Sequence, residues 1–468
     1  MRAHPIRRPA RARAGVRLAG WLVVVLVLGA APAARAANEP ATPPGVRVET
    51  LKNGLRLLLA PDSTAGAVDV AVWYLAGPAY EKPGIRGISH LFEHTMFRGS
   101  KNVGPQEHHR RIQAEGGTAN AFTNPDFTCY YETLPREALA LAFQLEADRM
   151  ASLRLTQDNL DAEKRVVREE RRWRGENNPL GRALQSLYTL GYPSHPYGWP
   201  VMGTEDDLDR ITLADCEAYF RTRYAPSNAV VTVVGQFDAD EAAKLARQWF
   251  GAVPRRAGGG ARPPRERAQT APRRGRERGE GPLPLLAVGW RGPGDADPDA
   301  PALELLSRLV AGSPSARLQK ELVGEKQSVL FLQSGFDGRR ESTLFYVVAA
   351  ARQGADSTAV ERDVIEGVER YARTPVTDEE LARARRQVEI GTLFGWQTSR
   401  GRAESIGTGF VVDGDAGYPW RELAKMRLLT PADVQRAAAR VLTAAHRNVL
   451  WSLPGPAPPA TAPAGGGR

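Results

Sequence analysis

An Arg/Pro/Gly-rich segment at residues 254–280 limits how this chain of 468 residues folds. The segment has almost no apolar periodicity, so we predict an interdomain linker there. It separates residues 38–253 from residues 281–455, two parts of similar size that are each long enough for a hydrophobic core of their own. A single small domain is therefore excluded.

Both parts mix two kinds of apolar pattern. Alternating runs that are typical of strands lie at residues 55–59, 68–75, 229–234, 285–290 and 343–350. Long amphipathic stretches that are typical of helices lie at residues 136–152, 155–174 and 378–394. The pattern predicts an α+β fold in each part. The Pro/Ala/Gly-rich tail, residues 456–468, is predicted to be disordered.

A weak internal repeat relates the two parts. Gly99-Ser100 aligns with Gly312-Ser313 at an offset of 213 residues, and in both places a Gly/Pro-rich loop and an amphipathic helix lead into Gly-Ser. In this register the second part has apolar or small residues opposite three polar residues of the first: His90, Glu93 and His94 fall opposite Leu303, Leu306 and Ser307. The repeat indicates a duplicated domain, and the alternative is a chance coincidence of two helices.

The positive charge is confined to two segments. The net charge is +10, but residues 1–36 contribute seven arginines without an acid, and residues 254–280 contribute a net +6. The remainder therefore has a net charge of −3. A nucleic-acid-binding surface needs clustered basic residues on a folded domain. The charge distribution excludes this class of protein, and no nucleic-acid partner is expected.

Residues 1–36 have the pattern of an export signal. An Arg-rich opening precedes an apolar run at residues 18–31 and the small-x-small sequence Ala34-Arg35-Ala36. The alternative is an uncleaved membrane anchor, but the run is shorter than the ~20 residues that a spanning helix needs. We therefore expect a cleaved signal peptide, no stable membrane span and an exported protein, either periplasmic or secreted.

The sharpest motif is His90-Leu91-Phe92-Glu93-His94. On a helix, histidines at positions i and i+4 project from one face, about one turn apart, and two imidazoles so placed are able to share one cation. Zinc takes such ligands together with a carboxylate, and a free carboxylate nearby then accepts a proton from the zinc-bound water. The motif predicts a zinc hydrolase.

A third ligand is expected from a carboxylate on another helix. Glu163 and Glu170 are seven residues apart, which places them two turns apart on one stripe of a helix, whereas Glu169 points elsewhere. Both stripe residues are candidates at this point. The alternative for any Glu-rich helix is a solvated face.

These motifs resemble the M16 metallopeptidases, the inverzincins that include pitrilysin, insulin-degrading enzyme and the mitochondrial processing peptidase. In that family H-x-x-E-H is followed some 75 residues later by a glutamate that has another glutamate seven residues before it. Glu170 lies 76 residues after His94. The resemblance continues in three further stretches, namely Gly116 to Thr123, His195-Pro196-Tyr197 with Gly203, and Tyr224 to Asn228.

The resemblance implies roles for individual residues. His90, His94 and Glu170 become the ligands of one zinc ion per chain, and Glu93 becomes the general base. Glu163 becomes a carboxylate that orients a ligand. The resemblance also implies two M16-type domains, each an antiparallel sheet packed with helices, that close like a clamshell on a peptide. An edge strand would bind the substrate backbone through Ala119, Asn120, Ala121 and Phe122.

The second part departs from the family pattern. Many members carry an Arg and a Tyr, seven residues apart, that hold the substrate, but the matching positions here are Val323 and Leu330. The departure implies an M16-like partner subunit that supplies the pair, with a homodimer as the alternative. The alternative function is a non-catalytic structural or peptide-holding subunit. The other histidines, Glu107-His108-His109 included, are interpreted as surface or helix residues, and Cys129 and Cys216 are not assigned to a disulfide.

Overall fold

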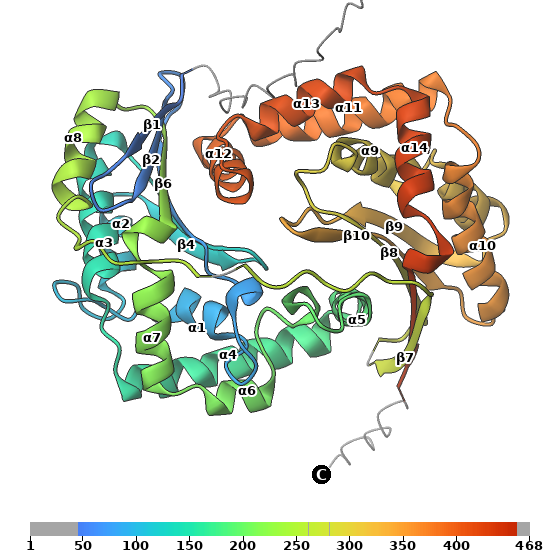
Figure 1. Cartoon of the computed structure of the whole chain (residues 1–468), viewed down its shortest axis with the longest axis horizontal. Coiled ribbons are helices and arrows are strands. Elements are labelled where there is room, and N and C mark those ends of the chain that lie inside the picture. The colour runs from blue at the N-terminus through green and yellow to red at the C-terminus, as the bar shows by residue number, and fades with distance from the viewer. Residues whose placement is uncertain (1–44, 261, 280, 456–468) are drawn as a thin grey trace, which may run out of the picture. The chain divides into compact units, whose positions relative to one another are not determined.

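The computed structural model describes residues 45–455 with the exception of residues 261 and 280 (Figure 1). The predicted signal peptide and the predicted disordered tail lie outside the described residues. In the described part of the chain, every helix is too short or too polar to cross a membrane.

The first sheet has six strands within the described residues, in the order β1-β2-β6-β3-β5-β4. These strands are β1 (Arg47–Thr50), β2 (Arg56–Pro61), β3 (Val68–Tyr74), β4 (Thr118–Thr123), β5 (Thr128–Leu134) and β6 (Ala229–Gly235). All neighbours are antiparallel except β2 and β6, which run parallel. The predicted strands at residues 55–59, 68–75 and 229–234 correspond to β2, β3 and β6.

The second sheet has five strands within the described residues, in the order β7-β11-β8-β10-β9. These strands are β7 (Arg273–Gly279), β8 (Leu285–Pro293), β9 (Val329–Phe336), β10 (Ser342–Ala351) and β11 (Arg447–Pro454). The pair of β7 and β11 is parallel and the other pairs are antiparallel. Strand order and direction therefore repeat the series β2-β6-β3-β5-β4, which supports the duplication.

Two details differ from the sequence-based expectation. Each sheet holds one parallel pair, because β6 and β11 return to their sheets only after long helical excursions and so enter beside β2 and β7 in the same direction. Residues 254–280 are not a linker throughout, since residues 273–279 form the edge strand β7. Three of its arginines, Arg274, Arg276 and Arg278, alternate with less exposed positions, a period of two that a search for apolar residues overlooks.

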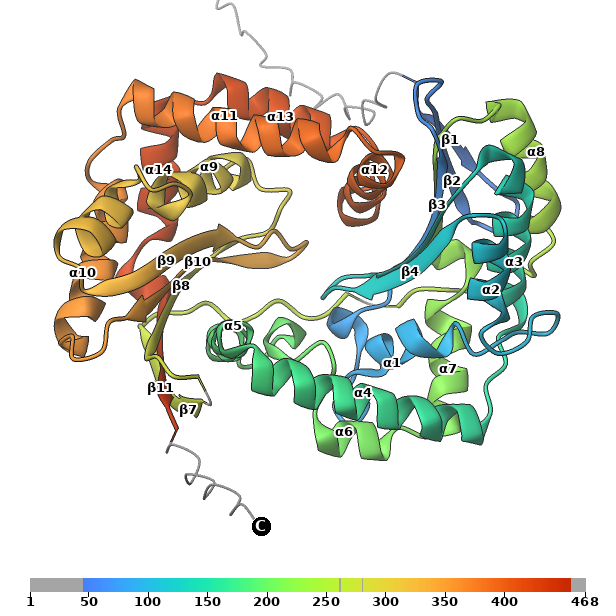
Figure 2. The ribbon, with the colours of Figure 1, turned by 180° about the vertical axis from the view of Figure 1, so that it is seen from behind.

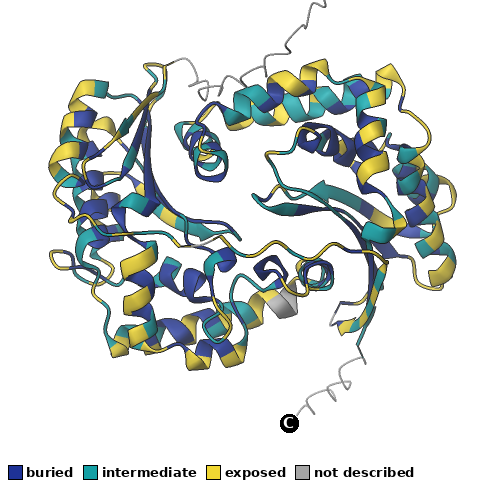
Figure 3. Cartoon of the chain, viewed as in Figure 1, coloured by how far each residue is buried: buried dark blue, intermediate teal, exposed yellow. Residues whose placement is uncertain are grey.

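Helices cover both sheets (Figure 3). In the first part they are α1 (Ile88–Thr95), α2 (Glu107–Ala114), α3 (Leu139–Ser152), α4 (Gln157–Asn177), α5 (Pro179–Gly191), α6 (Glu205–Arg210), α7 (Leu213–Arg223) and α8 (Ala239–Trp249). In the second part they are α9 (Ala300–Ala311), α10 (Ser357–Glu369), α11 (Asp378–Gly395), α12 (Ser399–Asp413), α13 (Tyr418–Leu428) and α14 (Pro431–Val441). The three predicted helices correspond to α3, α4 and α11.

Two helices pack on the sheet of the other part. Helix α5 packs against β8 and β11, whereas α12 packs against β3 and β6 (Figure 1). At the second contact Gly407 lies so close to the ring of Trp73 that a Cβ atom on Gly407 would be 2.2 Å from it. Arg402 of α12 also pairs with Asp62 next to β2. Each sheet is therefore covered in part by a helix from the other part of the sequence.

Candidate metal centre

Helix α1, which carries the motif, begins where the backbone at Gly87 packs closely against the backbone at Met202. Gly87 precedes the helix with a φ of 86°, and a Cβ atom on it would lie 2.6 Å from the carbonyl oxygen of Met202. The buried carboxylate of Glu81 accepts hydrogen bonds from the backbone N–H groups of Gly87 (2.7 Å) and Ser89 (2.9 Å). These contacts satisfy free N–H groups at the helix start and fix the position of the motif.

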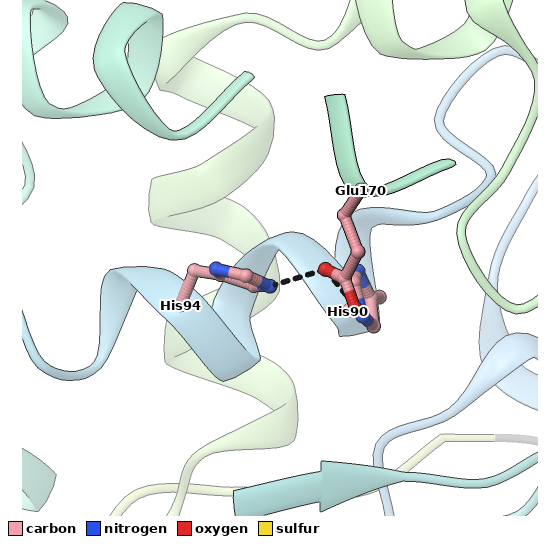
Figure 4. A group of neighbouring side chains, drawn as sticks. All are labelled: His90, His94 and Glu170. Atoms are coloured by element: carbon pink, nitrogen blue, oxygen red, sulfur yellow. Dashed lines mark ion pairs between the residues drawn. The ribbon is translucent and has the colours of Figure 1, made fainter. Parts of the chain in front are cut away.

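Helix α4 runs beside α1 and brings a carboxylate to both motif histidines (Figure 2). Glu170 Oε2 lies 3.2 Å from His94 Nε2 and 3.6 Å from His90 Nε2. His90 is 3% exposed, and its ring packs at 5.0 Å from that of His94. Figure 4 shows the carboxylate of Glu170 between the two imidazoles.

These three side chains fit a zinc ion. Their ligand atoms all lie within 4.8 Å of one another. Zinc bonds of about 2.0–2.1 Å in a tetrahedron put neighbouring ligand atoms roughly 3.3 Å apart, close to the observed separations from Glu170 Oε2. Glu170 Oε2 is buried and has no hydrogen-bond partner among the described residues. A buried carboxylate oxygen without a hydrogen-bond donor costs free energy, and a bound cation would offset this cost.

Two further contacts orient the candidate ligand side chains. Glu163, predicted as the orienting carboxylate, is buried and lies 3.5 Å from His94 Nδ1, while Arg98 donates a hydrogen bond to its other oxygen. A carboxylate at Nδ1 holds the proton there and leaves Nε2 free for a metal. Arg174 lies 2.6 Å from Glu170 Oε1 and so turns Oε2 toward the histidines. The sequence signal for Arg174 was its i+4 spacing from Glu170.

Glu93, the candidate base, lies beside the three candidate ligand side chains. Its Oε2 atom lies 4.0 Å from His90 Nε2 and accepts a hydrogen bond of 2.7 Å from Thr123 Oγ1. Burial raises the pKa of Glu93, partly offset by the Thr123 hydrogen bond. A carboxylate with a raised pKa is better matched to accepting a proton near neutral pH.

The histidine environments differ in charge. Burial, followed by the neighbouring His94, lowers the pKa of His90 to about 4, so this imidazole is neutral at pH 7. Burial also acts to lower the pKa of His94, but the carboxylates around it, Glu170 first, outweigh burial and the net shift is upward. The contact of 3.2 Å with His94 Nε2 lowers the pKa of Glu170. The carboxylates therefore act mainly on His94, whereas His90 is set by burial.

The predicted substrate strand borders this site. Strand β4 lies at the end of the first sheet, and within the described residues it pairs only with β5. Its last residue, Thr123, contacts Glu93, and the outward N–H group of Ala121 donates to Asn120 Oδ1 (2.8 Å). Ala119 and Phe122 lie on the same strand, half-buried. One edge of the sheet therefore leads directly to the candidate base.

Two histidines and both cysteines outside the candidate metal centre are buried. Among the histidines interpreted as surface or helix residues, His108 lies in helix α2, where it is buried and bonds to Glu132 (2.9 Å). The interpretation is wrong for His195, a buried loop residue. The ring of His108 packs against Phe97, and the ring of His195 packs between Tyr192 and Tyr197. Cys129 and Cys216 are free and buried.

His108, Glu132 and Glu146 form a second cluster of possible ligands. Arg149 donates to Glu146 and lies 3.5 Å from Glu132, so a guanidinium group already supplies the positive charge there. We interpret the cluster as a buried ionic network that joins α2, β5 and α3.

The second part has no donor at the positions expected for the Arg/Tyr pair. Val323 is half-buried in a short π-helix (Gln319–Glu325) and packs against the second core. Leu330 lies in β9, where it is the extra residue between the pairs that Val329 and Phe331 make with β10. Neither side chain offers a polar group.

Comparisons with known proteins agree with the fold. The family "Insulinase (Peptidase family M16)" matches residues 56–205, and the "Peptidase M16 inactive domain" matches residues 210–388. The chain is 31% identical over 336 residues to "Zinc protease PqqE" of Helicobacter pylori, which covers 71% of this chain and 76% of the relative.

Two further similarities extend over most of the chain. A "probable mitochondrial-processing peptidase subunit beta" of Arabidopsis thaliana is 25% identical, over 90% of this chain and 80% of that protein. A crystal structure of a protease from Helicobacter pylori superposes with a TM-score of 0.82 at 27% identity and covers 87% of this chain and 99% of that one. With two M16-type domains and a zinc protease among its relatives, the chain belongs to the M16 peptidase family.

Proposed function

We propose that the protein is a zinc-dependent endopeptidase that cleaves unfolded peptides. The observation that carries the proposal is the position of Glu170 Oε2, which lies within 3.6 Å of both histidine Nε2 atoms while Glu93 lies beside them. His90, His94 and Glu170 are the proposed ligands of one zinc ion, and Glu93 is the proposed general base. When bound, zinc polarises a water molecule and a peptide carbonyl.

The chain's own groups supply the proton transfers and their orientation. Glu93 accepts a proton from the attacking water and passes it to the leaving amine, and Thr123 holds its carboxylate in place. Glu163 keeps the proton of His94 on Nδ1. Arg174 holds one oxygen of Glu170, which leaves the other for the metal.

Strand β4 is the proposed binding site for the substrate backbone. An extended peptide that adds to a free strand edge gains main-chain hydrogen bonds with little side-chain selectivity. In the free protein Asn120 occupies the outward N–H group of Ala121, so substrate binding has to displace that side chain. The strand ends at Thr123, and a peptide on it therefore leads toward Glu93.

We further propose that the enzyme works outside the cytoplasm with an M16-like partner. The predicted signal sequence at residues 1–36 supports export. The apolar side chains of Val323 and Leu330 support a partner that supplies an Arg/Tyr pair, with homodimerisation as the alternative. Adding such a partner should raise kcat/KM at least about tenfold, because each lost donor to a transition state is worth roughly a few kcal/mol.

Two measurements on the purified chain test the function: its zinc content and its hydrolysis of an unstructured peptide. The wild type should hold about one zinc per chain, and His94→Ala should lose most of the metal and the activity, since two ligands do not hold zinc tightly. His446→Ala, in the second part, is the matched control and should keep both. Bound zinc without hydrolysis, with any partner, would favour the peptide-holding subunit instead.

A further inference from the structure

A second polar pocket lies apart from the metal centre. It has a volume of about 470 Å³ and is lined by the loop at His195, by residues 262–266, by the end of β8 and by residues 340–342. None of the proposed zinc ligands, the base or the β4 residues lines it. Four of the lining residues are arginines, namely Arg262, Arg265, Arg291 and Arg340.

The carboxylates in this pocket are already engaged. Glu266 accepts hydrogen bonds from the backbone N–H groups of Ser194 (2.8 Å) and His195 (2.7 Å). Asp297 accepts two from Arg440, at 2.7 and 2.8 Å. Glu341 lies 3.6 Å from Arg262.

The other three arginines have no carboxylate partner. Among the described residues, no carboxylate lies within ion-pair distance of Arg265, Arg291 or Arg340, although Arg291 donates to the carbonyl oxygen of Arg267 (2.8 Å) and Arg340 to the hydroxyl group of Tyr80 (3.4 Å). The Arg291 side chain lies over the ring of Tyr192, where its Nε atom is buried without a hydrogen-bond partner. A buried donor without an acceptor costs free energy unless something fills the site.

His195 adds a second donor of this kind. Its side chain is buried, with 2% exposed, and Nδ1 accepts a hydrogen bond from the backbone N–H group of Tyr197 (3.1 Å). A neutral imidazole that accepts at Nδ1 carries its proton on Nε2. Burial lowers the pKa of His195 to about 4, so the ring is neutral at pH 7. The Nε2–H group is therefore a donor, and it has no partner among the described residues.

We propose that this pocket binds an oxyanion, the carboxylate or phosphate group of an anionic ligand. The buried Nε2–H group of His195 and three arginines without a carboxylate partner line it, and one of these arginines, Arg291, has a buried Nε–H group without an acceptor. This donor set matches the acceptor oxygens of such a group. The pocket volume leaves room for the rest of a ligand that is larger than the anion itself.

Isothermal titration calorimetry of the full chain tests the site. The probes are inorganic phosphate and the acidic peptide Ac-Glu-Glu-NH2, with Ac-Gln-Gln-NH2 as the neutral control. We expect binding of phosphate, of the acidic peptide or of both, weakened by added salt, and no binding of the neutral peptide. Binding of phosphate alone identifies a phosphate ligand, and binding of the acidic peptide alone identifies a carboxylate ligand.

Three variants assign the binding to the pocket. Arg265→Gln removes an exposed arginine and should weaken binding at least about fivefold. His195→Asn keeps an acceptor for Tyr197 and removes the Nε2–H donor, so it should weaken binding about threefold or more. Arg276→Gln makes the same charge change on the exposed face of β7 and should keep the wild-type affinity within about twofold.

Two results would overturn the proposal. One is the absence of binding of either anion up to about 10 mM, which corresponds to a negligible affinity. The other is wild-type affinity in both Arg265→Gln and His195→Asn, as expected if the anion binds at the metal centre instead. Should His195→Asn fail to fold by circular dichroism, Arg265→Gln alone decides, since no described contact depends on that side chain.

Discussion

Helices α1 and α9 follow equivalent strands, β3 and β8, in the two sheets, yet their side chains differ in kind. Helix α1 carries His90, Glu93 and His94, whereas the aligned positions of α9 are buried residues: Leu303, Leu306 and Ser307. The neighbouring helices differ in the same way. When α4 and α11 are aligned on their N-cap residues, Thr156 and Thr377, the places of Glu163 and Glu170 are taken by Ala384 and Gly391.

The comparison shows which residues the fold requires and which it does not. The second part builds the same sheet order with apolar or small residues at all five places, so the fold does not require imidazoles or carboxylates there. Buried polar groups cost free energy unless they are paired. The proposed zinc ion would pair with such groups in the first part.

The largest effect is expected when the base is removed. Glu93→Gln keeps the size of the side chain and should lower kcat for peptide hydrolysis by roughly 10² to 10⁴, the usual contribution of general-base catalysis, while zinc content stays at the wild-type level. Glu169→Gln, exposed on α4, is the control and should be fully active. Retained activity in Glu93→Gln would show that another group accepts the proton.

A core substitution in the second part should act on stability instead. Leu306→Ala removes a fully buried side chain at the position that matches Glu93 and should lower the free energy of unfolding by about 2–5 kcal/mol. Chemical denaturation and zinc analysis measure the two effects separately, and zinc content should not change. A loss of zinc in the folded variant would mean that the second part contributes to the metal site.

Removing the orienting carboxylate should have a moderate effect. Glu163→Gln leaves His94 without its carboxylate at Nδ1 and should weaken zinc affinity by roughly 10- to 100-fold, the usual range for such partners. Competition with a chelator measures the affinity, and Glu169→Gln again serves as the matched control. Equal zinc affinities in Glu163→Gln and Glu169→Gln would show that Glu163 does not support zinc binding.

The smallest effect concerns the ionic network of the first part. Burial, followed by Arg149, lowers the pKa of His108 from 6.5 to about 3 in the folded state. As the pH falls from 7 to 5, the unfolded chain takes up a proton at this residue and the folded chain does not, so the folded state loses about 1–2 kcal/mol of stability. His108→Asn should lack this part of the acid sensitivity in denaturation curves at both pH values. Identical pH dependence in the two proteins would contradict the assignment.

Much of this structure was predictable from local sequence. Apolar alternation gave β2, β3 and β6 within two residues, and helical periodicity gave α4 with its stripe of Glu163 and Glu170. The spacing in H-x-x-E-H placed the two histidines on one face of a helix.

Other features depend on contacts between distant segments, which one sequence does not reveal. The Arg-rich strand β7 forms because it pairs with β11. Helix α12 packs on the first sheet because Gly407, which has no side chain, leaves space for the ring of Trp73. His108 is buried beside Glu132, a partner 24 residues away on β5. Thr123 contacts Glu93 only once α1 and β4 have come together.

Anomalous X-ray scattering at the zinc absorption edge, measured on crystals of the purified protein, tests the central claim most directly. We predict one zinc peak in each chain, about 2.0–2.2 Å from His90 Nε2, His94 Nε2 and a carboxylate oxygen of Glu170, and no peak between α9 and α11. A zinc peak in the second part, or one coordinated without Glu170, would contradict the account.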